Sequence, residues 1–133
     1  MSVTTRDKLE TWTLEFTDAF NRNDLDGVMN WFADDAIYDE FHGGRHEGKA
    51  AIRDAFEPQF AGRFGTMRFN QEDLFLDPET GKAMISWLCT LDSGDRYGGW
   101  RGLDLLHFDA DGRLLQKHTY AKTDKPQMRR LDR

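Results

Sequence analysis

Asp104 is the first residue of this 133-residue sequence whose type and setting could do chemistry. It interrupts an apolar run, and Trp100 and Phe108 lie four residues to either side of it on the same face of the expected strand. If the fold encloses this carboxyl, its protonated form is favoured and can donate to an oxyanion, or the group acts as a general base near neutral pH. The alternative is an edge strand on which Asp104 faces water.

Glu40 is the second candidate acid and lies on a strand expected over residues 36–41. Successive residues of a strand point to opposite faces, so Glu40 shares a face with Tyr38. Asp39 shares the opposite face with Phe41, and only one of these faces can enter the space between sheet and helices. Because a strand carboxylate is more often solvated than catalytic, the pattern alone leaves the role of Glu40 open.

The last expected strand carries a histidine, His118, which shares a face with Tyr120. Imidazole titrates near neutral pH, so His118 is a candidate proton shuttle. The position is more often typical of a structural or surface histidine. Lys117 and Thr119 occupy the other face of this strand.

Neither a metal nor a nucleotide cofactor is expected from the sequence. His42 and His46 are four residues apart, but Gly43 and Gly44 between them indicate a loop rather than a helical pair of ligands. These glycines also lack the strand–turn–helix context of a dinucleotide-binding turn. The single cysteine, Cys89, alternates with apolar neighbours and is predicted to be a small buried residue.

Periodic apolar residues predict helices in the first half of the chain. A stripe over residues 9–20 indicates a helix of about five turns, capped by Thr4. Asp24 is placed to cap a second, shorter helix. A third helix is expected from Lys49, and Pro58 should kink or end it just before that position, because proline lacks a backbone donor.

The second half of the chain alternates between apolar and polar residues, as strands do. Four strands with turn residues between them are predicted, over residues 67–76, 83–91, 97–108 and 114–122. Helices followed by a meander predict an α+β fold, with the helices packed on one face of a curved antiparallel sheet. Residues 124–133 are polar and are predicted to form a tail.

Composition narrows the classes of protein. The chain has ten Phe, four Trp and three Tyr, a net charge of −6 and a pI near 5.1. It does not provide the basic surface that nucleic acids or anionic membranes require. Its apolar runs are shorter than the roughly 20 residues of a membrane helix, and its first residues lack a signal peptide's apolar stretch. A single cysteine excludes an internal disulfide. We therefore expect a cytoplasmic domain that binds neither nucleic acid nor membrane.

Three stretches of the chain resemble the nuclear-transport-factor-2-like superfamily, in particular its SnoaL-like and ketosteroid-isomerase-like branch. They are residues 23–36, which include NDLDG and WFADDA, residues 47–53, EGKAAIR, and residues 104–114, which include DLLHF and DGRL. The similarity extends over residues 9–122 and implies one SnoaL-like domain over residues 1–123. It also implies a cone, or α-β cystatin-like barrel, in which a curved sheet wraps around three helices. Such cones have an apolar pocket at the open end and usually form homodimers.

The resemblance gives roles to both acids. In ketosteroid isomerases of this superfamily the general base falls in the register of Glu40, and a protonated carboxyl falls on Asp104. The two tyrosines of the oxyanion site fall on Phe16 and Phe56, which have no hydroxyl to donate. This departure argues against ketosteroid isomerisation itself. Arg101 lies on the opposite strand face from Asp104, so the similarity to limonene-type epoxide hydrolases is poor.

The family register also predicts which side chains line the cavity. They are Glu40, Asp104 and the aromatic residues Phe16, Phe20, Tyr38, Phe56, Trp87 and Trp100. Two alternatives stay open for the last strand. The resemblance turns Lys117 and Thr119 inward, whereas the alternation pattern turns His118 and Tyr120 inward. We take His118 as a catalytic candidate and Tyr120 as a substrate-binding candidate.

Two hypotheses of function follow. In the first, the protein is a cofactor-independent isomerase, cyclase, dehydratase or hydrolase that acts by acid–base chemistry on a small, apolar, carbonyl-bearing or polycyclic substrate. Glu40 is then the general base and Asp104 the electrophilic acid or second base, assisted by His118 or Tyr38. In the second, the same fold is a non-catalytic ligand-binding or dimerisation module whose acids pair with arginines. A cavity packed shut by its aromatic side chains would favour the second.

Overall fold

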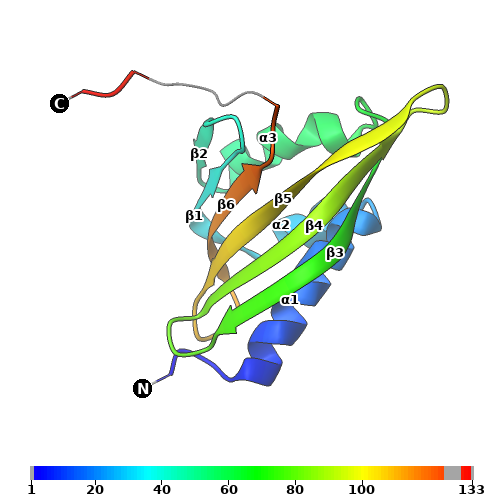
Figure 1. The fold of residues 1–133 in the computed structure, drawn as a ribbon. Helices are drawn as coiled ribbons and strands as arrows, with labels where there is room; N and C mark the ends of the chain where they lie inside the picture. The colour runs from blue at the N-terminus through cyan, green and yellow to red at the C-terminus, as the bar shows by residue number, and fades with distance from the viewer. Residues whose placement is uncertain (1, 125–129, 133) are drawn as a thin grey trace.

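A computed structural model describes residues 2–124 and 130–132, and in this part of the chain three helices pack against a six-stranded sheet (Figure 1). The helices are α1 (Arg6–Asn21), α2 (Leu25–Met29) and α3 (Lys49–Phe60). The strands are β1 (Phe32–Asp39), β2 (Arg45–Glu47), β3 (Thr66–Asp77), β4 (Lys82–Asp92), β5 (Tyr97–Phe108) and β6 (Leu114–Ala121). The predicted α+β class is confirmed. Most of the expected tail, residues 125–129 and 133, lies outside the described residues.

The sheet has the order β2-β1-β6-β5-β4-β3 and is mixed rather than entirely antiparallel. Strands β3 to β6 form the expected antiparallel meander. Strand β1 pairs parallel with β6, which corrects the all-antiparallel expectation. Alternation along a strand identifies its two faces but not the direction of its neighbour, so the pattern could not have given this pairing.

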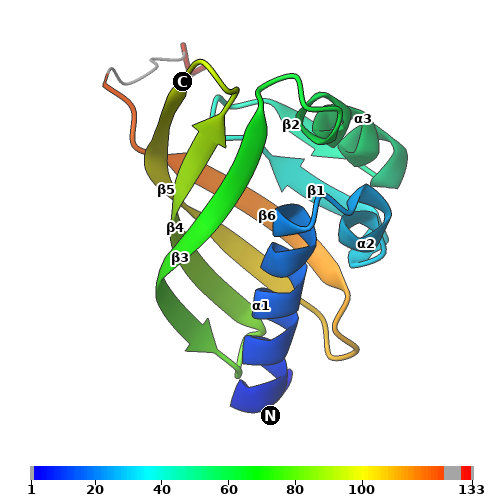
Figure 2. The same ribbon diagram turned by 90° about the vertical axis from the view of Figure 1, so that its right-hand side faces the viewer.

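Helix α1 lies along the sheet beside β3 and β4, as Figure 2 shows. Its buried residues, Leu9, Thr13, Phe16, Ala19 and Phe20, follow the predicted stripe. The expected cap was wrong by one residue, because the backbone turns extended at Thr5. There the hydroxyl accepts a hydrogen bond from the Lys8 amide at 3.3 Å.

The two shorter helices cover the β1–β2 end of the sheet (Figure 2). Asp24 caps α2 as predicted, because its carboxylate accepts a hydrogen bond from the Gly27 amide at 2.9 Å. Helix α3 does not end before Pro58 but continues to Phe60. Pro58 lies in the last turn, where its missing amide costs one intrahelical hydrogen bond and the chain leaves the helix shortly afterwards.

Strand β1 begins at Phe32 and ends at Asp39, so it starts earlier and ends earlier than expected. Residues 40–44 form a turn that leads into β2, a strand that the sequence pattern did not reveal. The Glu40 amide donates to the Gly44 carbonyl at 2.8 Å, and Gly43 adopts a positive φ of 94° that favours glycine. This turn returns the chain along β1 and places His46 opposite Tyr38.

Candidate functional site

A cavity of about 430 Å³ opens at the end of the molecule where α3, the 40–44 turn and β3 to β6 meet. Of the residues predicted to line it, seven do so: Phe20, Tyr38, Glu40, Phe56, Trp87, Trp100 and Asp104. Its aromatic side chains therefore surround an open space instead of filling it. The cavity is therefore not packed shut, which is the arrangement that would have favoured the non-catalytic module.

Phe16 was predicted to line the cavity but belongs to the core beneath it. Its ring is 1% exposed and packs edge-on against Phe20 at 5.2 Å and Phe32 at 5.7 Å between ring centroids. Phe20 lines the open space, whereas Phe16 does not. The correction follows from the helical turn between these two residues, which places them at different depths.

His118 and Tyr120 lie on the outer face of β6, which corrects the choice made from the alternation pattern. His118 Nδ1 lies 2.8 Å from the Asp39 carboxylate, and its Nε2 lies 2.8 Å from the Gln116 side-chain oxygen. Tyr120 is 57% exposed. The parallel partner β1 sets the inward face, since Lys117 lies opposite Tyr38 in the register and Lys117 and Thr119 line the cavity.

Asp104 is enclosed, as one of the two alternatives expected, but it is surrounded by donors. Trp87 Nε1 donates to Oδ2 at 3.2 Å, while Lys117 Nζ and the Thr119 hydroxyl donate to Oδ1 at 3.0 and 2.7 Å. Asp104 is 7% exposed and Lys117 4% exposed. A carboxyl with three donors is held as an acceptor, so it does not match the protonated donor expected from the sequence.

Gly102 allows one of these contacts. A Cβ atom at this position would lie 2.7 Å from the Trp87 indole, which crosses β5 here. The missing side chain therefore leaves room for the Trp87 indole, whose N–H donates to Asp104.

Tyr38 lies within the electrostatic influence of both acids. Its ring is buried, and Lys117 Nζ lies 4.5 Å from the ring centroid. Burial raises the pKa of the Tyr38 phenol well above its usual value, and the negative charges of Glu40 and Asp104 raise it further, while a hydrogen bond with Thr119 acts in the opposite direction. Tyr38 is therefore a neutral hydroxyl within the electrostatic reach of both carboxylates.

Glu40 reaches the cavity from the turn after β1, and both of its carboxylate oxygens contact a histidine. His46 Nε2 lies 2.6 Å from Oε1, and His42 Nε2 contacts Oε2. The His46 ring also stacks on Tyr38, with 5.7 Å between ring centroids. Glu40 is thus a partly buried carboxylate between two imidazoles.

Sequence reasoning missed several of these partners. Lys117 and Thr119 were present only as one alternative for the last strand, and His42 and His46 were considered only as metal ligands. The Gly-Gly pair at positions 43 and 44 was the available signal, since such a pair between short strands is typical of a hairpin turn. That turn would have placed both histidines beside Glu40.

The module hypothesis required the cavity acids to pair with arginines, but no arginine among the described residues contacts Glu40 or Asp104. In the described residues Arg101 contacts Glu72 at 3.0 Å, Arg45 contacts Asp39 and Glu47, and Arg53 contacts Asp26. These pairs lie outside the cavity lining. The charge partners of the cavity are instead one lysine and two histidines.

Across residues 2–124 and 130–132, no group of three or more His, Cys, Asp and Glu side chains is arranged to hold a metal ion. In the same residues, no helix is both long enough and apolar enough to cross a bilayer.

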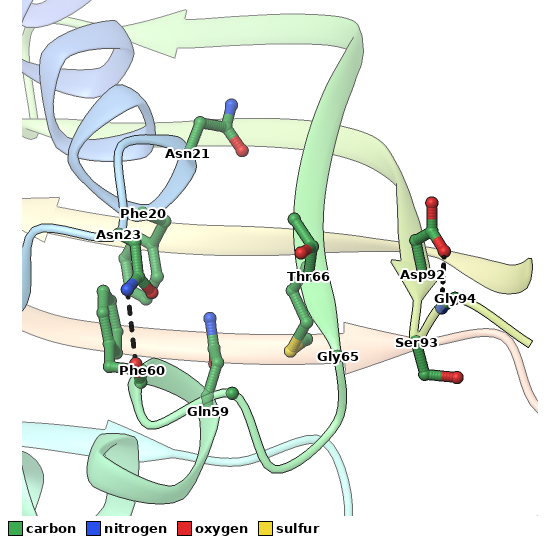
Figure 3. Close-up of a pocket in the computed structure, with 12 residues that line it drawn as sticks. Phe20, Asn21, Asn23, Gln59, Phe60, Gly65, Thr66, Asp92, Ser93 and Gly94 are labelled. Atoms are coloured by element: carbon green, nitrogen blue, oxygen red, sulfur yellow. Dashed lines mark hydrogen bonds between the residues drawn. The ribbon is translucent and has the colours of Figure 1, made fainter. Parts of the chain in front are cut away.

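A second hollow of about 620 Å³ lies beside the cavity and is larger, but it is a weaker candidate for chemistry (Figure 3). Phe20, Gln59 and Met67 line both spaces. In Figure 3 the Asn23 amide donates to the Phe60 carbonyl, and the Asp92 carboxylate accepts from the Gly94 amide. Its polar groups thus mainly hold its own loops, whereas the smaller cavity contains buried charges.

Comparison with known proteins identifies the fold. Over residues 13–116 the sequence matches the model of the SnoaL-like domain. No curated protein sequence matches the chain significantly. A candidate polyketide cyclase from Xanthomonas campestris pv. campestris is 19% identical with a TM-score of 0.71, and the match covers 86% of this chain and 90% of that one.

Two further solved structures are similar. An NTF2-like protein of unknown function from Mesorhizobium loti is 21% identical with a TM-score of 0.72, covering 88% of this chain and 93% of that one. The epoxide hydrolase/cyclase-like enzyme SalBIII, with a role in pyran ring formation in the polyether salinomycin, is 15% identical with a TM-score of 0.76, covering 87% and 92%. Others are described as cystatin-like. Since the family model matches most of the chain, this protein belongs to the SnoaL-like domain family.

Proposed function

We propose that this protein is a cofactor-independent acid–base enzyme that acts on a small, apolar, carbonyl-bearing molecule, as an isomerase or cyclase does. One observation carries the proposal. Glu40, a carboxylate between two imidazoles, lines the same open aromatic cavity as the buried cluster around Asp104. Such a pairing of a convergent polar set with apolar walls is typical of small-molecule active sites.

Glu40 is the general base of this proposal. Its carboxylate takes a proton from the carbon next to the substrate carbonyl, and the electron pair of that C–H bond moves into the carbonyl to give an enolate. Where a C=C bond adjoins that carbon, the enolate is conjugated, and returning the proton to its far carbon isomerises the substrate. Attack of the enolate carbon on an electrophile within the molecule instead closes a ring. His42 and His46 contact the two carboxylate oxygens and orient them.

Asp104 enters the proposal as a positioning residue. It holds Lys117 and Thr119 in place, and Trp87 fixes its second oxygen. The two phenylalanines at the family's tyrosine positions donate no hydrogen bond, so ketosteroid isomerisation is not proposed. Tyr38, whose raised pKa keeps its phenol protonated, is the hydroxyl that remains to assist.

The similar structures support this reaction class without naming a substrate. The Xanthomonas campestris protein is a candidate polyketide cyclase, and SalBIII is described as epoxide hydrolase/cyclase-like. Both descriptions name a cyclase or cyclase-like protein. Their identities below 25% support a shared fold, and the reaction is carried over only as part of the proposal.

Proton exchange tests the proposal without a known substrate. In deuterated buffer, wild-type protein should accelerate loss of the α-proton NMR signals of 1-tetralone, an apolar bicyclic ketone, above the buffer rate. Glu40→Gln should lower the protein-dependent rate by about 10²–10⁴, the usual contribution of a general base. The matched control is Glu79→Gln at an exposed position.

The exchange assay also separates the proposal from its alternative. Equal rates for wild-type and Glu40→Gln protein would remove Glu40 as the base. Binding of 1-tetralone without any exchange would favour the non-catalytic ligand-binding module. Homodimer formation and a cytoplasmic location stay predictions, and light scattering on the purified chain checks the first.

A further inference from the structure

Lys117 is a buried cation that lines the cavity and that the proposed proton transfer does not use. It extends from β6 opposite Tyr38 of β1 and is 4% exposed. Burying an ammonium group is costly unless acceptors satisfy its donors. The acceptors around its ammonium group therefore indicate what kind of ligand the site can bind.

The ammonium group of Lys117 has three N–H donors, and side chains of the protein accept two of them. Asp104 Oδ1 lies 3.0 Å from Nζ, and Thr119 Oγ1 lies 2.6 Å from it. The remaining surroundings are aromatic faces, with Nζ at 4.5 Å from the Tyr38 centroid and at 5.6 and 5.7 Å from those of Phe20 and Phe56. An aromatic face attracts a cation less strongly than a charged oxygen does.

Both carboxylate oxygens of the same cluster already accept hydrogen bonds from the protein. Asp104 accepts from Trp87, Lys117 and Thr119, and the Thr119 proton is used in doing so. Among the described residues that line the cavity, Lys117 is the only lysine or arginine. A ligand oxygen that reaches this cluster can thus accept a hydrogen bond from the third N–H of the Lys117 ammonium group.

The walls around Lys117 determine the rest of the ligand. Phe56, Trp87, Trp100 and Met67 line the space beside it, and its volume of about 430 Å³ lies in the usual range of small-molecule pockets. A bicyclic apolar skeleton fits such walls better than a polar chain does. Ring faces can stack on the aromatic residues while an oxygen at the ring edge reaches Lys117.

We propose that the cavity binds an apolar ring compound with one acidic oxygen, such as a carboxylate, a phenolate or an enolate, and that Lys117 binds this oxygen. The inference rests on the proposed function only in sharing its cavity. In the proposed reaction, the oxygen is that of the enolate formed when Glu40 removes the α-proton. Lys117 then stabilises the negative charge on this oxygen, which the phenylalanines at the family's tyrosine positions cannot do.

Calorimetry with a charged and a neutral probe of the same shape tests the inference. Wild-type protein should bind 2-naphthoate at least about tenfold more tightly than 2-naphthamide, because a charge-assisted hydrogen bond is the difference between them. Lys117→Met should abolish this preference, and the control Lys122→Met, at an exposed position, should keep it. Equal binding or no binding of the two probes by wild-type protein would overturn the inference, as would a preference that persists in Lys117→Met.

A second variant covers the case in which Lys117→Met does not fold. Asp104→Asn leaves the buried ammonium without its counter-charge, so an anionic ligand should replace that charge. 2-Naphthoate should therefore raise the Tm of Asp104→Asn by more than it raises that of the wild type, whereas 2-naphthamide should raise both equally. An equal rise with 2-naphthoate contradicts the inference.

The probe-binding and proton-exchange experiments together distinguish failure of this inference from failure of the proposed function. A preference for the charged probe together with no exchange of 1-tetralone protons keeps the anion site and removes the enzyme proposal. Exchange without that preference keeps the base and removes the role of Lys117.

Discussion

The two acids of the cavity have opposite kinds of partner. Asp104 lies in the middle of β5 and accepts from an indole, an ammonium group and a hydroxyl, each held by a neighbouring strand. Glu40 lies in a turn after β1, and its oxygens contact His42 and His46, which the same turn and β2 supply. Asp104 is almost fully enclosed, whereas the side chain of Glu40 is 17% exposed.

This contrast assigns the acids different roles. The partners of Asp104 are fixed by the sheet and keep it as an acceptor, which suits a residue that positions others. The partners of Glu40 are the imidazoles of His42, in the 40–44 turn, and His46, in the short strand β2, and Glu40 itself is more exposed than Asp104, which suits a residue that exchanges protons. The following predictions test this difference, from the largest expected effect to the smallest.

Removing each carboxylate should affect stability very differently. Asp104→Ala should lower the free energy of unfolding by about 3–5 kcal/mol, because it leaves a buried ammonium group unpaired. Glu40→Ala should cost about 1 kcal/mol, since its contacts are partly solvated. Urea unfolding at pH 7 measures both. Similar losses for the two variants would contradict the division of roles.

The two histidines should differ in their effect on proton exchange. His46 is the less exposed of the two and stacks on Tyr38, so His46→Ala should lower the 1-tetralone exchange rate by about tenfold through misplacement of Glu40. His42→Ala should change the rate by less than about threefold by the same reasoning. The two rates are measured at equal protein concentration, and a larger loss in His42→Ala would reverse the assignment.

Tyr38 should make the protein less stable at alkaline pH. Its pKa is raised by burial and by both acids, so the folded state keeps the phenol neutral while the unfolded state loses the proton above about pH 10. Stability is therefore retained below pH 10 and lost as pH rises further. Between pH 9 and 11, Tyr38→Phe should lose about 1 kcal/mol less than the wild type does. Urea unfolding measures this difference, and the exposed Tyr120→Phe serves as the control.

Cys89 should be inert, as expected of a buried residue. It is 0% exposed, and burial, together with the charge of Asp104, raises the pKa of its thiol to about 11. A thiol-specific disulfide reagent at pH 8 should not react with the native protein and should react after unfolding in urea. Ser93→Cys, in the exposed β4–β5 turn, should react at once under native conditions.

Sequence reasoning gave the class of the fold because helical stripes and strand alternation are local. The stripe of α1, the Asp24 cap and the four long strands needed no knowledge of distant contacts. The parallel pairing of β1 with β6 did need such knowledge, and this pairing turns Lys117 rather than His118 toward the cavity. The alternation pattern had favoured His118 and Tyr120, and only the resemblance pointed to Lys117 and Thr119.

The site could be predicted from the sequence only where a charged residue stood out among apolar neighbours. Asp104 in an apolar strand is such a residue, and its enclosure was one of the two alternatives expected. Lys117 was kept only as one alternative for the last strand, behind His118. A lysine is rarely buried unless it is paired, and the pattern does not reveal its partner, which lies 13 positions away on another strand. His42 and His46 depended on a turn whose strand, β2, is only three residues long.

The indole N–H signals of the four tryptophans test the central claim, that the cavity is where ligand binds, most directly. Trp87 and Trp100 line the cavity, whereas Trp12 and Trp31 pack around Phe108 outside its lining. In an NMR titration with 1-tetralone, the first two signals should shift together and the other two should stay in place. Shifts confined to Trp12 or Trp31, or no shift of Trp87 and Trp100 at saturating ketone, would contradict the claim.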